Sequence, residues 1–111
     1  MTRLPENQVF SLTDLIACRP GRISSRTLIE AAGAASPALA LYALAEGESI
    51  SDESSPHNKL ITVSSGQIEI TMGTNILIIK EGQSIIITHN TLHRFYAPQD
   101  CILIQMAYEQ N

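Results

Sequence analysis

The sequence contains no tryptophan and only two cysteines, Cys18 and Cys101, in 111 residues. The cysteines show neither metal-ligand nor redox spacing, so we expect two free thiols in a reducing compartment and no disulfide framework. No apolar run approaches the ~20 residues that are needed to span a bilayer. Pro5 and Glu6 also interrupt the region in which a secretory signal would need an apolar core. These absences predict a cytoplasmic protein that has no membrane partner.

Positive charge is also scarce, with 7 Lys and Arg against 11 Asp and Glu and a net charge of -4. The basic residues are scattered along the chain. Because nucleic-acid binding depends on many Lys and Arg contacts to phosphates, we expect no nucleic-acid partner. The hydrophobic fraction of 44% and the charged fraction of 16% are typical of a globular protein, and the length predicts one domain over residues 1–111.

Residues 1–20 are predicted to form an extended lead-in that contains one short helix. Ser11 is a suitable N-cap residue, and Asp14 follows three positions later, as in a capping box. Pro20 and Gly21 end this segment. We therefore expect a helical turn over about residues 11–17, which covers one end or edge of the fold.

Residues 21–108 consist of short apolar runs, many of them rich in isoleucine, separated by turn residues. This pattern is typical of an all-β sandwich or barrel. Residues 38–45 fit a helix by their alanine and leucine content, or a strand by their alternation. Residues 48–56 are predicted to form a polar bend. Residues 75–80 are predicted to form a strand that is buried on both faces. The other expected strands are 21–30, 59–64, 67–72, 83–87, 93–97 and 102–108.

The chain reads Gly82, five residues, Thr88, one residue, Asn90, two residues and His93. This spacing resembles the second motif of the cupin family, which has glycine, proline, glycine and histidine at these four positions. The first glycine and the histidine are retained here. Asn90 suits a turn position that requires left-handed backbone, where the family has glycine.

The first cupin motif has a glycine, two histidines, a glutamate and a final glycine. Its spacing falls here on Gly47, Glu53, Ser55, Lys59 and Gly66, so both glycines are in place and none of the three metal ligands is kept. The resemblance covers about residues 39–106 and is closest to the short, single-domain, RmlC-like cupins with one conserved barrel. It implies a small jelly-roll β-barrel, or double-stranded β-helix, over residues 21–108. It favours a strand at 38–45, and it implies a homodimer, as is usual for such cupins.

His93 is the first candidate site residue, because the resemblance places it at the start of a strand and pointing into the barrel mouth. A neutral imidazole can contact a ligand, bind a metal or transfer a proton near pH 7. The alternative is a barrel-lining histidine that a hydrogen bond holds in place. We favour contact with a ligand and place metal binding well behind it.

Lys59, Glu53 and His57 complete the candidate site. Lys59 stands where the family has a carboxylate, and it could form an ion pair with Glu53 in place of the metal. His57 has the same strand parity as Lys59, although its position after a proline favours an exposed loop. A pocket that contains Lys59 and His93 would suit a small anionic ligand such as a carboxylate.

Three functions follow from these residues. We favour a barrel that binds a small molecule and has no resident metal. The second is a metal-dependent enzyme of the dioxygenase or isomerase type, in which Glu53, His57 and His93 hold iron, manganese, nickel or zinc; Lys59 argues against it, because an ammonium repels a dication. The third is a structural or regulatory protein that uses the barrel surface. The resemblance fixes a scaffold and leaves the chemistry and the substrate open.

Overall fold

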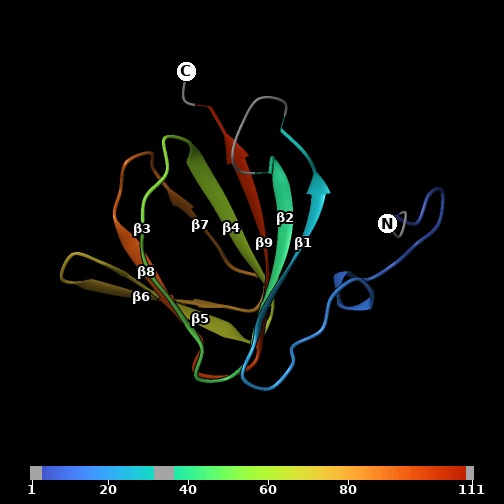
Figure 1. The fold of residues 1–111 in the computed structure, drawn as a ribbon, viewed down its shortest axis with the longest axis horizontal. Coiled ribbons are helices and arrows are strands. Elements are labelled where there is room, and N and C mark those ends of the chain that lie inside the picture. Colours follow the sequence, from blue (N-terminus) through green and yellow to red (C-terminus); the bar gives the residue numbers. More distant parts are fainter. Residues whose placement is uncertain (1–3, 32–36, 110–111) are drawn as a thin grey trace.

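The computed structural model describes residues 4–31 and 37–109, which form two antiparallel β-sheets that face each other (Figure 1). The larger sheet has the strand order β1-β2-β9-β4-β7, and the smaller sheet has the order β3-β8-β5-β6. The fold is the all-β jelly-roll barrel that the sequence predicts. The strands are β1 (Ile23–Ile29), β2 (Leu39–Leu44), β3 (Ser49–Glu53), β4 (Asn58–Ser65), β5 (Gln67–Met72), β6 (Asn75–Lys80), β7 (Ser84–Ile87), β8 (His93–Tyr96) and β9 (Cys101–Tyr108).

The stretch at 38–45 forms strand β2, which pairs with β1 on one side and β9 on the other. Alanine and leucine favour a helix in isolation, but pairing along both edges outweighs that preference here. Leu44 packs into the core between the sheets, and Leu41 is fully buried on the opposite face of the strand. The strand that the cupin resemblance favours is therefore confirmed.

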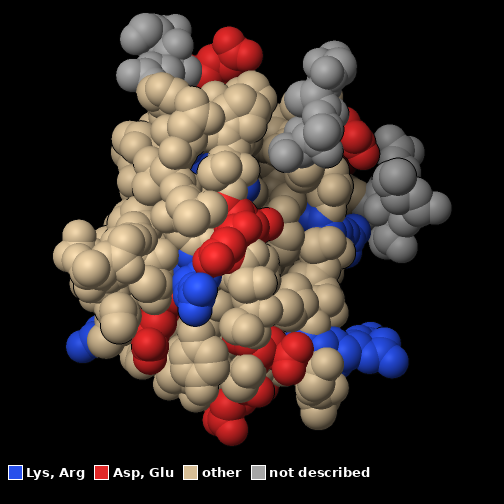
Figure 2. Space-filling view, turned by 60° about the vertical axis from the view of Figure 1, so that its left-hand side comes forward, with Lys and Arg blue, Asp and Glu red and all other residues tan. Residues whose placement is uncertain are grey.

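The polar stretch at 48–56 is not simply a bend, because it contains strand β3. This strand pairs with β8, where Ile50 lies opposite Phe95. It is the edge strand of the smaller sheet, and Ile50 and Glu53 are its only half-buried residues, which explains its polar composition. Charges of both signs are mixed on this side of the molecule (Figure 2).

The prediction that residues 75–80 are buried on both faces is wrong. Ile79 is 4% exposed, whereas Ile76 and Ile78 are 63% and 53% exposed. Strand β6 is the other edge of the smaller sheet, and Ile76 and Ile78 lie on its outer face, opposite Thr71 and Glu69 of β5. The isoleucines therefore reflect the preference of β-branched residues for strands more than burial.

The N-terminal helix is shorter than predicted: a single 3₁₀ turn at Leu12–Asp14. Asp14 Oδ2 accepts a hydrogen bond from the Ser11 N–H at 3.0 Å, as in the predicted capping box. The turn does not extend into an α-helix. No helix among residues 4–31 and 37–109 is long and apolar enough to cross a membrane.

The segment after this turn is bonded to the larger sheet. Arg26 Nη1 donates a hydrogen bond to the Leu15 carbonyl at 3.0 Å. The Cys18 thiol lies 3.6 Å from the Leu44 carbonyl and 3.5 Å from the Cys101 carbonyl, and it can donate to either. Both cysteines are free thiols, as predicted. Burial raises the pKa of Cys18, and it raises the pKa of Cys101 to about 12.

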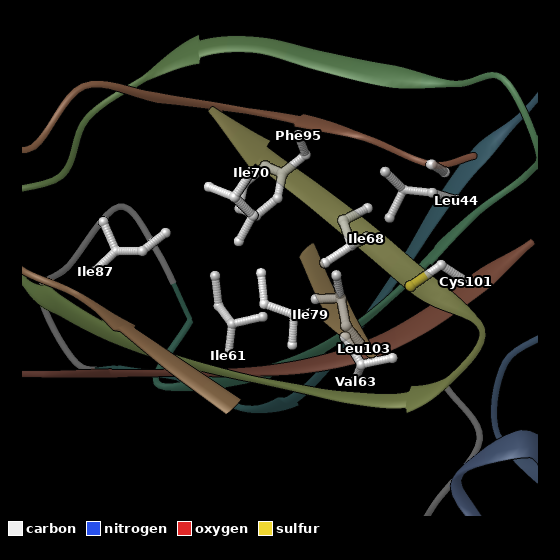
Figure 3. Close-up of a cluster of buried hydrophobic side chains, with 11 residues drawn as sticks. Leu44, Ile61, Val63, Ile68, Ile70, Ile79, Ile87, Phe95, Cys101 and Leu103 are labelled. Atoms are coloured by element: carbon white, nitrogen blue, oxygen red, sulfur yellow. The ribbon is translucent and has the colours of Figure 1, made fainter. Parts of the chain in front are cut away.

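The core lies between the two sheets, where inward side chains from both interdigitate (Figure 3). Ile61 and Val63 of β4 and Leu103 of β9 point from the larger sheet toward Ile68 and Ile70 of β5. Four of these five side chains have no exposed surface, and Leu103 is 3% exposed. Each such side chain stabilises the fold by roughly 1.5–3 kcal/mol relative to its exposed state.

Gly66, in the turn between β4 and β5, is required for two reasons. Its φ is +77°, in the left-handed region, and a Cβ atom here would overlap the Asp100 carbonyl oxygen. Gly73, in the next turn, has a φ of +61°, but a Cβ atom there would meet no atom within 4 Å. Both glycines thus have a left-handed backbone, but only Gly66 lies against another part of the chain.

We expect Gly66→Ala to destabilise the protein more than Gly73→Ala does. A left-handed alanine costs about 1–2 kcal/mol, which is the whole cost at Gly73. At Gly66 the backbone near Asp100 must also move, so the loss should be about 3 kcal/mol. Equilibrium urea unfolding of the two variants measures both values. Equal losses would show that the close approach to Asp100 is unimportant for stability.

Candidate functional site

A cavity of about 50 Å³ lies between the sheets, and strands β2, β3, β4, β8 and β9 supply its walls. At roughly 10–15 Å³ for each water, this volume holds about three to five atoms of that size. Half of the lining is apolar, from Leu44, Ile50, Phe95 and Leu103. The polar half comes from Tyr42, Glu53, Lys59 and Gln105.

Lys59 reaches this cavity from β4, on the same face as Ile61 and Val63. Ile87 and Ala107 lie opposite it on the neighbouring strands, and the residue is only 8% exposed. Among the residues that the structure describes, none accepts a hydrogen bond from its ammonium or forms an ion pair with it. The side chain thus borders the cavity without an anion from the described part of the protein. A cation that loses part of its hydration without gaining a partner is destabilised, so an anion in the cavity would be a favourable partner for this group.

Glu53 reaches the cavity because strand β3 contains one extra residue. Ile50 lies opposite Phe95 and Glu53 lies opposite His93, so three residues on β3 correspond to two on β8. This β-bulge places Ile50 and Glu53 on the same, inner side of the strand. Asp52 consequently points outward, where it forms an exposed ion pair with Arg94 at 3.2 Å.

The expected ion pair between Glu53 and Lys59 does not form. Both side chains line the cavity, but no hydrogen bond or ion pair joins them, and within the described ranges the Glu53 carboxylate has no other such partner. The cavity is therefore bordered by two opposite charges that do not neutralise each other by direct contact.

Tyr42 and Gln105 are site residues that sequence reasoning missed. Burial raises the pKa of the Tyr42 hydroxyl, and the nearby Glu53 carboxylate raises it further. Gln105 is only 7% exposed although it lies in the otherwise apolar strand β9. The signals were present in the sequence: Tyr42 interrupts an alternation of small residues, and Gln105 interrupts an apolar strand.

His93 begins β8 and is 2% exposed, so it points inward as the motif predicts. Its Nδ1 lies 2.8 Å from the Thr91 carbonyl oxygen, and its ring meets the Phe95 ring edge-on at 5.2 Å. When Nδ1–H donates to that carbonyl, Nε2 is left as an acceptor. Nε2 is the only buried side-chain nitrogen or oxygen without a hydrogen-bond partner in the described part of the chain.

His93 does not line the cavity itself. It lies across from Glu53, beside Phe95, and it borders an open groove on the other side together with Asp52, Leu92 and Arg94. His93 is thus a neighbour of the cavity, next to the lining residues Glu53 and Phe95, and is not itself part of the lining.

His57 lies outside the cavity, in the bend before β4, where it is half-buried. Its backbone N–H donates to Ser55 Oγ at 3.1 Å. The structure therefore does not bring Glu53, His57 and His93 together.

The residues near the cavity do not fit the divalent metal that the second predicted function requires. No three His, Cys, Asp or Glu side chains form a group that could hold a metal ion among residues 4–31 and 37–109. Only Glu53 and His93 lie on adjacent strands, and the Lys59 ammonium borders the same cavity. A cation at this position repels a dication.

Comparison with known families and structures agrees with the fold. The family model described as the cupin domain matches residues 40–104. A conserved protein of unknown function from Streptococcus pyogenes has a TM-score of 0.86 at 24% identity, over 99% of this chain and 94% of that one. A cupin superfamily protein from Desulfitobacterium hafniense has a TM-score of 0.85 at 21% identity, over 98% and 97%.

A more distant structure, an RmlC-like cupin from Shewanella frigidimarina, has a TM-score of 0.60 at 16% identity over 66% of each chain. At these identities the similarity shows the fold alone. Comparison with curated proteins found no match.

The proximity of Tyr42 and Glu53 leads to a titration test. Glu53→Gln removes a negative charge that disfavours tyrosinate, so the pKa of Tyr42 should fall. It should stay above its ordinary value, because burial, the larger cause, remains. The ¹³Cζ chemical shifts of the tyrosines, followed from about pH 8 to pH 12, measure this change. Glu69→Gln on β5 is the control. An unchanged Tyr42 titration in Glu53→Gln would contradict the geometry.

Proposed function

The chain belongs to the cupin domain family, and from this premise we propose that its barrel binds a small molecule with a carboxylate group in the cavity between the sheets. The observation that carries the proposal is Lys59, a residue that is only 8% exposed and that borders the cavity without an anion of its own. A carboxylate there would supply the missing charge-assisted hydrogen bonds.

The shape of the cavity supports a small ligand. Its volume of about 50 Å³ admits a carboxylate and a few further atoms. The apolar walls at Leu44 and Leu103 would contact the carbon part, and the Gln105 amide can donate or accept a hydrogen bond. A purely structural barrel would instead be expected to fill this space with apolar side chains.

A metal-dependent enzyme is the second candidate, and one observation favours it. The Nδ1 atom of His93 faces a backbone carbonyl, which is the arrangement that orients Nε2 of a metal-binding histidine. The missing third ligand and the nearby Lys59 ammonium weigh against it. We therefore rank it below the binding function.

We further infer that the protein is a homodimer that forms through the outer face of the larger sheet. Ile86, Leu60, Met106, Leu39 and Ile29 lie in register across all five strands. Ile86, Ile29 and Met106 are 54%, 54% and 40% exposed. The outward positions of β2, β4, β7 and β9 carry no charged residue, so two copies could meet over these four strands without repulsion. On β1, Arg26 lies opposite Leu41 on the same face.

The size of this face limits the strength of the dimer. Five strands at ~4.8 Å spacing give a width of ~24 Å, and their four to eight residues at ~3.3 Å give ~13–26 Å in the other direction. The whole face thus has a flat area of roughly 500 Å², of which the part near Leu41 and Ala43 is already covered within the chain. The remainder is smaller than the ~800 Å² of accessible surface that each partner buries in a standard interface, so the dimer would be of the weaker kind.

The protein is further proposed to work in the reducing cytoplasm and without nucleic acid. Its two cysteines are free thiols, which such a compartment preserves. The basic side chains on the face shown in Figure 2 lie among acidic ones and form no continuous positive area.

The binding function predicts that small carboxylates, such as acetate and propionate, bind the wild-type protein and lose at least about tenfold in affinity in Lys59→Ala. Lys80→Ala, at an exposed position of β6, is the matched control and should bind like the wild type. Isothermal titration calorimetry with a panel of small acids measures the affinities. Equal binding by wild type and Lys59→Ala would disprove the proposal.

The same samples test the second candidate. Metal analysis of protein that was purified without an affinity tag should find no stoichiometric metal. Iron, manganese, nickel or zinc at one ion for each chain would reverse the ranking of the two functions.

The dimer predicts a particle of twice the chain mass of 12.1 kDa. Met106→Glu places a charge at the centre of the apolar row, and it should yield monomers because two carboxylates would be buried against each other. Ile76→Glu, on the outer face of the smaller sheet, should remain dimeric. Light scattering after size-exclusion chromatography measures the mass. A monomeric wild type, or dissociation by Ile76→Glu alone, would contradict this interface.

A further inference from the structure

The cavity has two charged walls of opposite sign. Lys59 on β4 supplies an ammonium, and Glu53 on β3 supplies a carboxylate from the opposite sheet. The two groups line the same space of about 50 Å³ without forming an ion pair. The space between them is therefore bordered by a positive group on one side and a negative group on the other.

The two charged groups also have opposite hydrogen-bonding roles. An ammonium has three donors and no acceptor, whereas an ionised carboxylate has only acceptors. A molecule that satisfies both must present an anionic acceptor to Lys59 and a donor to Glu53. Tyr42 and Gln105 can adapt to either end, because a hydroxyl and an amide both donate and accept.

A simple monoanion satisfies only one of the two walls. Its carboxylate would pair with Lys59, but it would also bring a second negative charge into the small cavity that Glu53 already borders. Like charges at such short range disfavour each other, and more so when they are shielded from water. A neutral molecule would leave both Glu53 and Lys59 without a partner of opposite charge.

We propose that the resident ligand is a small zwitterion, the ammonium and carboxylate head of an amino acid. Its carboxylate binds Lys59 and its ammonium binds Glu53, so the filled cavity carries no net charge. The apolar walls at Ile50 and Phe95 contact the short carbon link. A volume of about 50 Å³ suits glycine or the head of a slightly larger amino acid. This inference rests on the proposed function, since it specifies what else the carboxylate-bearing ligand carries.

The first test compares three probes on the wild-type protein at one pH near neutrality and one ionic strength. Glycine carries both charges, acetate carries only the carboxylate, and methylammonium carries only the cation. Glycine should bind at least about tenfold more tightly than either half, because only glycine pairs both walls. Isothermal titration calorimetry or ligand-detected NMR measures the three affinities. Acetate binding as tightly as glycine would overturn the inference and leave the proposed function intact.

The second test separates the two walls with near-isosteric variants. Glu53→Gln should weaken glycine binding at least about tenfold, while acetate binding should stay the same or strengthen because the like charge is gone. Lys59→Met should weaken both glycine and acetate. Glu69→Gln on the half-buried outer side of β5 and Lys80→Met at an exposed position of β6 are the controls. Circular dichroism and thermal unfolding check that each variant is folded.

The outcomes distinguish binding of a zwitterion from binding of any carboxylate. Loss of glycine binding in both Glu53→Gln and Lys59→Met supports the zwitterion. Loss in Lys59→Met alone, with glycine and acetate binding equally to Glu53→Gln and to the wild type, overturns it. Absence of binding by any probe to the wild type, or equal binding to the wild type and Lys59→Met, overturns the proposed function as well.

Discussion

The site depends on a single extra residue in β3. In a regular antiparallel pair, Ile50 opposite Phe95 would place residue 52 opposite His93. The bulge places Glu53 there instead and sends Asp52 outward to Arg94. Two carboxylates that are adjacent in the sequence thereby have different environments: one forms a solvent-exposed ion pair, and the other borders the cavity. A regular strand would bring the shorter aspartate inward and would remove Arg94 from its partner.

Much of the fold could be predicted from the sequence, because turns and strand boundaries are local properties. Gly47, Gly66 and Gly82, the glycines of the motif spacing, all have positive φ, and Asn90 adopts a φ of +59° where the family has glycine. The errors concern properties that depend on distant parts of the chain. Strand β3 forms because β8 pairs with it, and the isoleucines of β6 are exposed because that strand is at an edge.

The candidate site could be predicted only in part, for the same reason. Motif spacing located Lys59 and Glu53, which do line one cavity, but it could not show that their charged ends remain apart. That separation depends on the distance between two sheets and on the bulge. Tyr42 and Gln105 lie on β2 and β9, outside the motif positions, and they reach the cavity only through the pairing of those strands with each other and with β4. His57 has the inward parity of Lys59, but it precedes the start of the strand.

The attachment of Cys18 gives the protein an internal reporter. Its thiol is held against the carbonyls of Leu44 and Cys101, and burial keeps its pKa raised, so little reactive thiolate is present while the N-terminal segment is docked. Cys101 is fully buried in the core and is still less reactive. Detachment of residues 11–20 would expose this thiol and remove the burial that raises its pKa, so the rate at which a maleimide modifies Cys18 should rise when the segment detaches.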